Sequence, residues 1–271
     1  MHAELDESHE LAVRAAFPED YAAFASLFPE LLVDDPVPSA AVWASALCPS
    51  TLLATRAGIV LGYCYFQEYA DTGYVRNVVV AEAARKSGVG RALMRATFER
   101  LRAHGKRSWR LNVRSNNAPA LALYRSMGMS VKYVTQMLRV PWSALAALPA
   151  GSAQVRESDP ERDAALESRF GLVSGQLADA RALGNLTLEA TAESEPVGVA
   201  VFNPRYPGAF PFRARELAVA NALLTAMRSS IPESDFVNLV LEDAASLAAA
   251  LRARGASSKD EFLHLEAPLE P

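Results

Sequence analysis

The stretch with the clearest capacity for chemistry is a short, basic, glycine-spaced segment, Arg85-Lys86-Ser87-Gly88-Val89-Gly90. It lies between the apolar run 75–80 and a helical run, 91–102. A strand that enters such a turn and opens into a helix leaves the first helical N–H groups without partners, and the helix dipole adds roughly half a positive charge there. The two glycines lack a Cβ, so an anionic oxygen can approach the main chain. The segment therefore predicts a phosphate-binding loop.

Two common phosphate-binding motifs do not fit this segment. The dinucleotide fingerprint needs a third glycine where the chain has Leu93, and the nucleoside-triphosphate loop, G-x-x-x-x-G-K-[ST], does not occur in the chain. Between Ala83 and Lys132 the chain has 12 lysines and arginines against one acid, Glu99. Nucleic acid also binds basic segments, but neither an aromatic platform nor a basic tail accompanies this one. We therefore expect a phosphorylated cofactor and not a nucleic acid.

A second motif follows about 27 residues downstream, at Asn117-Ala118-Pro119-Ala120-Leu121-Ala122-Leu123-Tyr124-Arg125-Ser126-Met127-Gly128-Met129. Together, Arg-x-x-Gly-x-Gly and the later Asn-x-x-Ala-x-x-Leu-Tyr-x-x-x-Gly resemble the acetyl-CoA site of the GNAT superfamily of N-acetyltransferases. The resemblance covers roughly residues 10–141 and departs at Met129, where the family has Phe. It implies an α/β (α+β) fold with a mixed, mostly antiparallel sheet flanked by helices.

The resemblance also implies which residues bind acetyl-CoA: Val78, Val80, Arg85, Lys86, Ser87, Gly88, Val89, Gly90, Arg91, Asn117 and Tyr124. The main-chain groups of the two valines would pair with the pantetheine amides where two neighbouring strands separate. The alternative interpretation is that the two valines are ordinary core residues and that Asn117 only caps a helix. No metal is expected.

For Tyr124 the resemblance implies a general acid that protonates the leaving thiolate. A phenol with a pKa near 10 is a weaker acid than a thiol near 8.5, so the transfer is uphill by about 2 kcal/mol. A neighbouring Arg114 or Arg125 would reduce this cost by favouring the phenolate. The alternative is a half-buried tyrosine that only packs the helix.

The general base is not identified by any motif. The acid that histone-type members carry eleven residues before the loop is Tyr74 here. Glu68 on the preceding strand is the candidate we select, with Asp71 and a water held by Asn77 as alternatives.

The acceptor is expected to be a primary amine. The link between the first two helices, which lines the acceptor cleft in this fold, contains Asp34 and Asp35. With Glu30 and Glu68, these acids would suit a cationic amine, although a solvated loop explains them equally well. Aromatic residues of the adjoining strand would suit a flat or apolar substrate: Tyr63, Tyr65, Phe66 and Tyr69.

Apolar periodicity and turn residues predict alternating elements in the first half. In order, we expect strand 11–16, helices 18–27 and 38–47, strands 51–56, 59–69 and 73–81, helix 88–103, strand 107–113, helix 118–127 and strand 131–140.

The second half of the sequence repeats the first half, and the offset between aligned residues decreases along the chain. Residues 85–93 align with 215–223 at an offset of 130, Gly128 with Gly255 at 127, and Leu61-Gly62 with Val197-Gly198 at 136. We predict a catalytic copy at 1–142 and a degenerate copy at 152–271, joined by the linker 143–151.

The second copy is degenerate because its equivalents of the site residues cannot do the same chemistry. Ala218 and Ala220 replace the loop glycines, Glu216 replaces Lys86, and Ala244 and Leu251 replace Asn117 and Tyr124. We expect a structural lobe, with ligand sensing or partner binding as the alternative.

Composition sets the remaining expectations. The chain has 271 residues, is 51% apolar, carries a net charge of −4, and has no apolar run long enough to cross a membrane. Its two cysteines are too few for a disulfide framework. We expect a cytoplasmic monomer with pseudo-twofold lobes, or a homodimer. The expected function is acetyl-CoA-dependent N-acetylation of a small-molecule amine or of a peptide or protein amino terminus; the alternative is a non-catalytic acyl-CoA-binding sensor or scaffold.

Overall fold

A computed structural model describes residues 10–33, 36–231 and 233–269 of the chain. The first half contains β1 (Ala12–Ala15), α1 (Tyr21–Leu27), α2 (Ala40–Val42), β2 (Thr51–Arg56), β3 (Ile59–Glu68), β4 (Thr72–Val80), α3 (Val89–Ala103), β5 (Ser108–Arg114), α4 (Ala118–Ser126) and β6 (Ser130–Pro141). The second half contains β7 (Gln154–Glu157), α5 (Asp163–Phe170), α6 (Gln176–Ala182), β8 (Leu186–Ala192), β9 (Glu195–Asn203), β10 (Gly208–Ala214), α7 (Leu217–Ser230), β11 (Phe236–Glu242), α8 (Ala245–Arg252) and β12 (Ser257–Pro268).

Short helical turns connect these elements. They are η1 (Pro18–Asp20), η2 (Phe28–Leu31), η3 (Trp43–Leu47), η4 (Cys48–Ser50), η5 (Glu82–Ala84), η6 (Trp142–Ala147) and η7 (Pro160–Arg162). The helix predicted at 38–47 is α2 continued by the π-helical turn η3. The helix predicted at 18–27 is η1 followed by α1. The other elements predicted for the first half are present, with ends that differ by at most two residues.

The chain divides into two compact units that are not contiguous in sequence. The first comprises residues up to 111, residues 119–130 and the C-terminal end from Glu266; the second comprises residues 112–118 and 131–265. We propose that the repeat itself is 1–142 and 152–271. The units differ from these copies because their last strands are exchanged.

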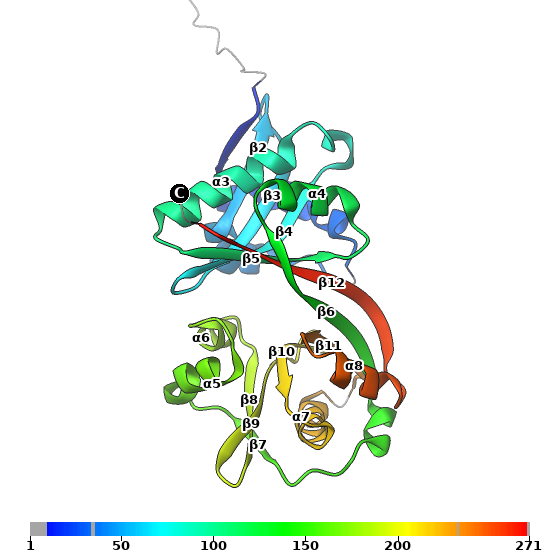
Figure 1. Cartoon of the computed structure of the whole chain (residues 1–271). Coiled ribbons are helices and arrows are strands. Elements are labelled where there is room, and N and C mark those ends of the chain that lie inside the picture. The colour runs from blue at the N-terminus through cyan, green and yellow to red at the C-terminus, as the bar shows by residue number, and fades with distance from the viewer. Residues whose placement is uncertain (1–9, 34–35, 232, 270–271) are drawn as a thin grey trace, which may run out of the picture. The chain divides into compact units, whose positions relative to one another are not determined.

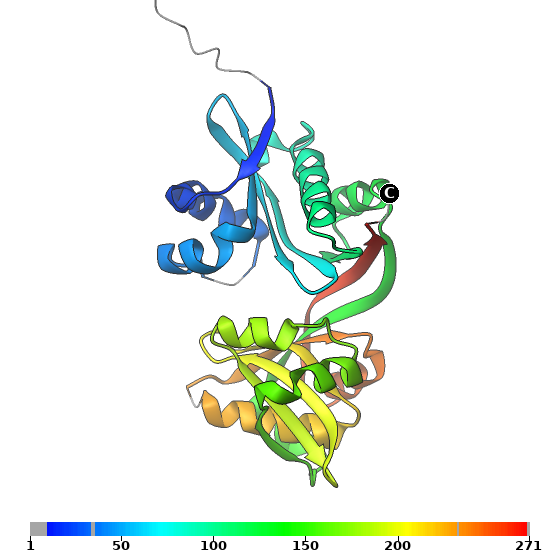
Figure 2. The ribbon, with the colours of Figure 1, turned by 90° about the vertical axis from the view of Figure 1, so that its left-hand side faces the viewer.

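In the first unit the strands follow the order β1-β2-β3-β4-β5, with the end of β12 after β5. β1 to β4 are antiparallel, whereas β4 and β5 are parallel. The helices of residues 21–47 cover one face of these strands and α3 covers the other (Figure 2). Phe24, Trp43 and Tyr63 form the core under the first face, where the rings of Phe24 and Trp43 stack 4.4 Å apart.

The opposite face of the first unit packs on α3. The Thr97 hydroxyl on α3 donates to Cys64 Sγ on β3 at 3.2 Å, and Phe98 contacts the buried Trp109 of β5 edge to face. α3 therefore lies across β3 and extends toward β5 (Figure 1).

The second unit repeats this plan with the order β12-β6-β11-β10-β9-β8-β7. β10 and β11 are parallel, as β4 and β5 are. Its core includes Phe202, Phe212 and Leu223. The predicted fold class, a mixed and mostly antiparallel sheet in two tandem copies, is confirmed.

The exchanged strands are the last of each copy. β6 pairs antiparallel with β11 from Thr135↔Glu242 to Pro141↔Phe236, inside the second unit. In the first unit, the Leu269 N–H donates to the Arg107 carbonyl at 2.8 Å and Arg110 forms an ion pair with Glu266. Each unit is thus completed by a segment from the other half of the sequence.

Candidate functional site

The predicted phosphate-binding loop connects β4 to α3. The chain leaves β4 at Val80, forms η5, and enters α3 through Gly88, whose φ of 88° is left-handed. A Cβ added to Gly88 would meet nothing within 4 Å, so the backbone conformation and not crowding selects glycine there. The N–H groups of the first turn of α3 have no carbonyl partner in the helix and end at this loop. The loop has the form of an anion site.

The second loop glycine has a different role. Gly90 lies inside α3, and a Cβ there would be 3.4 Å from Leu123 Cδ2 on α4 and 3.7 Å from Val80 Cγ2. These are ordinary contacts, so a methyl group fits, but a branched side chain would push against α4. Gly90 therefore allows α4 to lie close to the start of α3.

The charges of the loop suit an anion. Lys86, with a positive φ of 62°, and Arg91 are exposed beside the α3 N-terminus. Cations at this end of a helix are unfavourable unless an anion joins them. Arg85 forms an ion pair with Glu30 of η2 at 2.5 Å, a contact that the sequence did not indicate. The residues present therefore fit the phosphates of acetyl-CoA.

Beyond the loop, β4 has a segment that is not in register with β5. The parallel pairs run from Thr72↔Ser108 to Val75↔Leu111, while β4 continues to Val80. The Ala81 N–H donates to Leu61 of β3, and the Val79 carbonyl also faces β3. Because main-chain groups alternate along a strand, those of Val78 and Val80 point away from β3. This is the orientation that an added, strand-like ligand needs.

Tyr124 lies on the side of the sheet that α3 covers. It is buried, and burial raises its pKa, with a smaller contribution from Cys64 on β3. The pKa of Cys64 is itself raised to about 12 by burial. The shift at Tyr124 is opposite to the lowering that we expected from Arg114 or Arg125. The phenol therefore holds its proton throughout the neutral range.

Glu68, the selected base, lies at the far end of α3. Its carboxylate is 2.9 Å from His104 Nδ1, 3.8 Å from Lys106 Nζ and 4.0 Å from Arg100 Nε. Basic groups gather at this C-terminal end because the helix dipole favours them. The 15 residues of α3 separate this cluster from the phosphate loop by ~22 Å along the helix. Glu68 therefore lies at the end of α3 remote from the phosphate loop, and its role as the base stays a prediction.

Two other acids considered for the acceptor side of the site have basic partners in the structure. Glu30 is bound to Arg85, and the pKa of Asp71 is lowered by its hydrogen bond from Arg107. Asp34 and Asp35 lie outside the described residues. Asn117 directly precedes α4, and its N–H donates to the Arg114 carbonyl at 3.0 Å.

Sequence reasoning missed a polar group around the middle of β4. The register between β3 and β4 shifts by one residue between Tyr65 and Phe66, so Arg76 is an extra residue in β4. Its guanidinium Nε donates to Gln67 Oε1. The run 74–80 contains no glycine or proline that would have indicated a bulge.

The second copy has the corresponding helix but a shorter loop. Val80 pairs with Gly62 on β3, and Ala214 pairs with Gly198 on β9. A Cβ on either glycine would press on the helix, on Val89 in α3 or on Val219 in α7. These contacts confirm the offset of 130 for the helices. Eight residues (81–88) lie between the strand and the helical valine in the first copy and four (215–218) in the second, so the loop of the second copy is shorter as well as substituted.

The linker covers the start of α7. The Asn221 side chain on α7 donates to the Pro149 carbonyl at 3.0 Å, and a Cβ on Gly151 would be 2.4 Å from the Ala218 carbonyl oxygen. Leu148 of the linker is buried in the core of the second unit. A phosphate cannot reach this helix start as it can reach that of α3.

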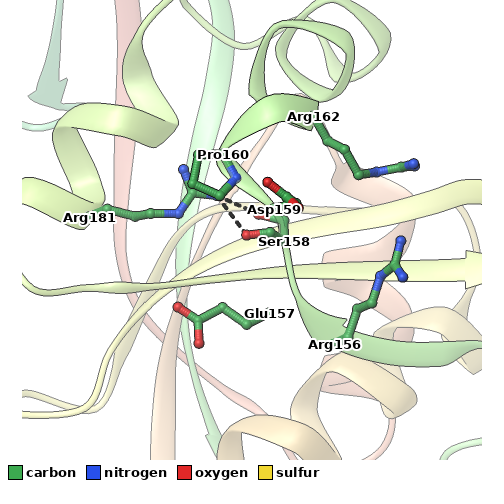
Figure 3. A pocket seen from close by; sticks show the side chains of 7 residues that line it. All are labelled: Arg156, Glu157, Ser158, Asp159, Pro160, Arg162 and Arg181. Carbon is green, nitrogen blue, oxygen red and sulfur yellow. Dashed lines mark hydrogen bonds between the residues drawn. The ribbon is translucent and has the colours of Figure 1, made fainter.

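The second unit also has a hollow of about 480 Å³ lined by charged residues (Figure 3). Arg156 and Arg162 both bind Glu189, which is completely buried. Arg181 binds Asp163 and the Ser158 side chain. The arginines thus neutralise buried acids of their own unit.

Comparison with known proteins finds a family similarity in the first copy and a shared fold over both copies. The Acetyltransferase (GNAT) family model matches residues 16–129, the part that holds the loop and Tyr124. Over these residues the first copy is similar to the GNAT family. Both copies have the fold, since a tandem GNAT protein from the clavulanic acid biosynthesis pathway superposes with a TM-score of 0.65 over 97% of this chain and 99% of its own, at 19% identity. A putative acetyltransferase from Pyrococcus horikoshii superposes with a TM-score of 0.74 over 99% of this chain and 92% of its own, at 17% identity.

Among curated proteins, the Escherichia coli ribosomal protein bS18-alanine N-acetyltransferase is 32% identical over 76 residues, which are 28% of this chain. The chain spans about half (51%) of the length of that relative. GNAT proteins are acyltransferases that use acetyl-CoA. Within the described residues, no group of three or more His, Cys, Asp or Glu could hold a metal ion, and no helix is long and apolar enough to cross a membrane.

Proposed function

We propose that the chain is an acetyl-CoA-dependent N-acetyltransferase that acts on a primary amine through its first copy. The observation that carries this proposal is the loop before α3, where Gly88 is left-handed and uncrowded and where the N–H groups of the helix start meet exposed cations. The second copy keeps the helix but has a shorter, substituted loop before it. One acetyl-CoA per chain is therefore expected.

The proposed cofactor residues are those of the loop and of the segment of β4 beyond its pairing with β5. The N–H groups of Val89 and Gly90 bind phosphate, with Lys86 and Arg91 supplying charge. The main-chain groups of Val78 and Val80 bind the amides of the pantetheine arm. Acetyl-CoA supplies a thioester, an activated acyl group that a neutral amine can attack.

Tyr124 is the proposed proton donor to the departing thiolate. Because burial raises its pKa, the phenol is fully protonated at neutral pH, and it gives up that proton less readily than an ordinary phenol. It therefore works best if the proton moves only as the negative charge develops on sulfur. Glu68 is the proposed base for the amine proton, with Asp71 and a water held by Asn77 as the alternatives.

Two kinds of acceptor follow from the comparisons and the site. The bS18-alanine N-acetyltransferase, by its name, acts on a ribosomal protein, which makes a peptide amino terminus one candidate. A small-molecule amine is the other.

The deciding experiment measures thiol release from acetyl-CoA over a panel of small amines and short peptides, with acetyl-CoA binding followed by calorimetry. We expect release with at least one amine, one binding site per chain, and a kcat that falls about 10²–10⁴-fold in Tyr124→Phe with unchanged acetyl-CoA affinity. Binding without release from any amine would instead establish the sensor or scaffold. An undiminished rate in Tyr124→Phe would remove Tyr124 from the mechanism.

A further inference from the structure

The two copies begin with the same three elements. β1, from residue 12, corresponds to β7, from residue 154, and η1 and the start of α1 correspond to η7 and the start of α5 at the same offset of 142. This offset continues the decreasing series found further along the repeat. Arg14 on β1 therefore aligns with Arg156 on β7, and these arginines are paired with Leu53 and Glu189 on the neighbouring strands. The side chains at these positions can be compared one by one.

In the first copy, Arg14 has an anion of its own. Its Nη1 and Nη2 atoms donate to the two carboxylate oxygens of Asp20, the last residue of η1, at 2.7 Å each. Its cross-strand neighbour on β2, Leu53, is completely buried and uncharged. Bidentate contacts between arginine and carboxylate are among the strongest hydrogen-bonded pairs. The three positions together are neutral, and Arg14 is already occupied.

The second copy has different charges at two of the three positions. Arg162 replaces Asp20, and the completely buried Glu189 replaces Leu53. Arg162 Nη2 donates to Glu189 Oε1 at 2.6 Å, whereas Arg156 Nη2 is 3.5 Å from Oε2. One carboxylate therefore faces two guanidinium groups. The three positions carry one net positive charge, where the first copy carries none.

Arg156 is the guanidinium that the buried acid does not need. Its side chain is 61% exposed, against 39% for Arg162, and it makes the longer of the two contacts with Glu189. The short contact from Arg162 already neutralises the acid. A guanidinium has five N–H donors, and each of these two gives one to Glu189. The structure records no further acceptor for either group among the described residues.

The two guanidinium groups line the hollow of about 480 Å³ in the second unit. Figure 3 shows them at one end of this hollow and Arg181 at the other. Arg181 is fully engaged, because it binds the carboxylate of Asp163 and both oxygens of Ser158. A hollow of this volume is of the size that proteins use for small molecules.

Two exposed acids restrict what the hollow accepts. Glu157 and Asp159 also line it, and neither forms an ion pair with the two guanidinium groups among the described residues. Glu157 points away from these groups (Figure 3), and Asp159 accepts a hydrogen bond from the Glu161 N–H. Their negative charges oppose a second anionic group on a ligand. The hollow therefore suits a molecule with one oxyanion group and not a polyanion.

We propose that the second copy binds a small molecule through a carboxylate or phosphate group held by Arg156 and Arg162. Arginine binds both kinds of group through parallel N–H donors. The site is separate from the loop before α3, and the inference does not rest on the proposed function. It makes the second copy a ligand-binding lobe and not only a structural one.

The test follows the Nε–H signals of Arg156 and Arg162 by NMR in the ¹⁵N-labelled full chain. The spectra of Arg156→Gln and Arg162→Gln identify the two signals. The probes are acetate and inorganic phosphate, each titrated against chloride at equal ionic strength. We expect saturable shifts of both signals with at least one probe and none with chloride. Shifts with phosphate alone identify a phosphorylated ligand, and shifts with acetate alone identify a carboxylate. No saturable shift with either probe would overturn the proposal.

Arg156→Gln removes the surplus charge and keeps the buried pair of Arg162 with Glu189, so the chain should fold normally. We expect the affinity for the probe, read from the Arg162 signal, to fall about 10- to 100-fold. Arg169→Gln is the matched control, since Arg169 lies in the same unit and forms an ion pair with Glu195. The affinity should then change by less than about 2-fold. An unchanged affinity in Arg156→Gln, or an equal loss in the control, would overturn the assignment.

A double variant gives the second copy the charges of the first. Arg162→Asp with Glu189→Leu reproduces the arrangement of Arg14, Asp20 and Leu53, which the first copy already accommodates. The Arg156 signal should no longer respond to either probe, because the new carboxylate occupies its guanidinium. Thermal unfolding verifies that the variant is folded. A folded double variant that still binds the probe with full affinity would show that the surplus charge does not make the site.

Discussion

The two copies share the packing of a helix on a sheet. They differ in the loop that connects the preceding strand to that helix. In both, a β3-like strand has a glycine under a helical valine, Gly62 under Val89 and Gly198 under Val219. The loop that precedes Val219 is four residues shorter than the loop that precedes Val89. The comparison shows that side-chain packing preserves the fold, while a short stretch of backbone decides whether an anion can bind.

The copies also differ in what lies against the helix start. In the first, exposed Lys86 and Arg91 surround it. In the second, the linker occupies the same place, with Pro149 accepting a hydrogen bond from Asn221. In the second copy the linker occupies the place where an anion would bind in the first copy. A single substitution should therefore not restore binding.

The largest expected effect concerns the exchanged strand. A chain that ends at Gly255 lacks β12, and with it the segment from Glu266 to Leu269 that completes the first unit. We expect loss of acetyl-CoA binding by calorimetry, although every loop residue is present. A chain that ends near Ser143 should fail in the same way and aggregate, because β6 also loses its partner β11.

A pair of substitutions in the full chain tests the same point. Leu269 is buried and Pro268 is exposed. Leu269→Asp should destabilise the first unit by several kcal/mol, as expected for a buried charge, whereas Pro268→Asp should have little effect. If the Gly255 truncation binds acetyl-CoA normally, the first unit does not need its exchanged strand.

The sequence predicted those parts of the molecule that depend on local pattern. The glycine spacing before α3 and the Asn-to-Tyr motif of α4 are each contained in about a dozen residues, and both were found. The strand predicted at 131–140 is present as β6, but alternation along a strand does not reveal its partner, so its pairing with β11 was missed.

Long-range contacts explain what the sequence did not indicate. Glu68 was selected because it is an acid on the strand before the loop strand, but its contact with His104 at the C-terminal end of α3 could not be foreseen. The ion pair of Arg85 with Glu30 joins residues from separate elements, and the bulge at Arg76 depends on the pairing of β4 with β3. None of these contacts leaves a local trace in the sequence.

The next prediction concerns the loop glycines. Gly88→Val should abolish acetyl-CoA binding, because valine does not adopt a φ of 88° without strain and its side chain fills the phosphate position. Gly90→Ala should bind nearly normally, since a methyl group there makes only ordinary contacts, whereas Gly90→Val should not bind. Calorimetry measures all three.

The matched variant in the second copy is Glu216→Lys. It restores the cation that the first copy has at Lys86, but the short loop and the linker remain. We expect one binding site per chain, as in the unmodified protein. Two sites would show that charge alone silences the second copy.

A smaller effect is expected at the Glu30–Arg85 ion pair. The pair is partly exposed, so it contributes little to stability, but it holds an arginine of the loop and places a negative charge near the phosphates. Glu30→Gln should tighten acetyl-CoA binding about 2- to 5-fold, most clearly at low salt. Glu82→Gln in η5 is the control; an equal gain there would indicate a general charge effect and not release of Arg85.

The smallest expected effect is a loss of stability at alkaline pH in the first copy. Burial raises the pKa of Cys64 to about 12, and it also raises the pKa values of Tyr63 and Tyr124, all in the first copy. Below the ordinary thiol pKa near 8.5, Cys64 is protonated in both the folded and the unfolded state. Above it, the unfolded state loses the proton first, so the stability that the protonated thiol contributes declines as pH rises toward 12.

The slope for Cys64 alone is at most about 1.4 kcal/mol per pH unit. Trp142 lies in the second unit, so a Trp142→Phe background leaves Trp43 and Trp109 as fluorescence reporters of the first. Urea unfolding of this background between pH 8 and 10 should show a decline that Cys64→Ala reduces. A decline of the same slope in Cys64→Ala would mean that the thiol is not the group that titrates, and would leave the buried phenols of Tyr63 and Tyr124 as the source of the alkaline sensitivity.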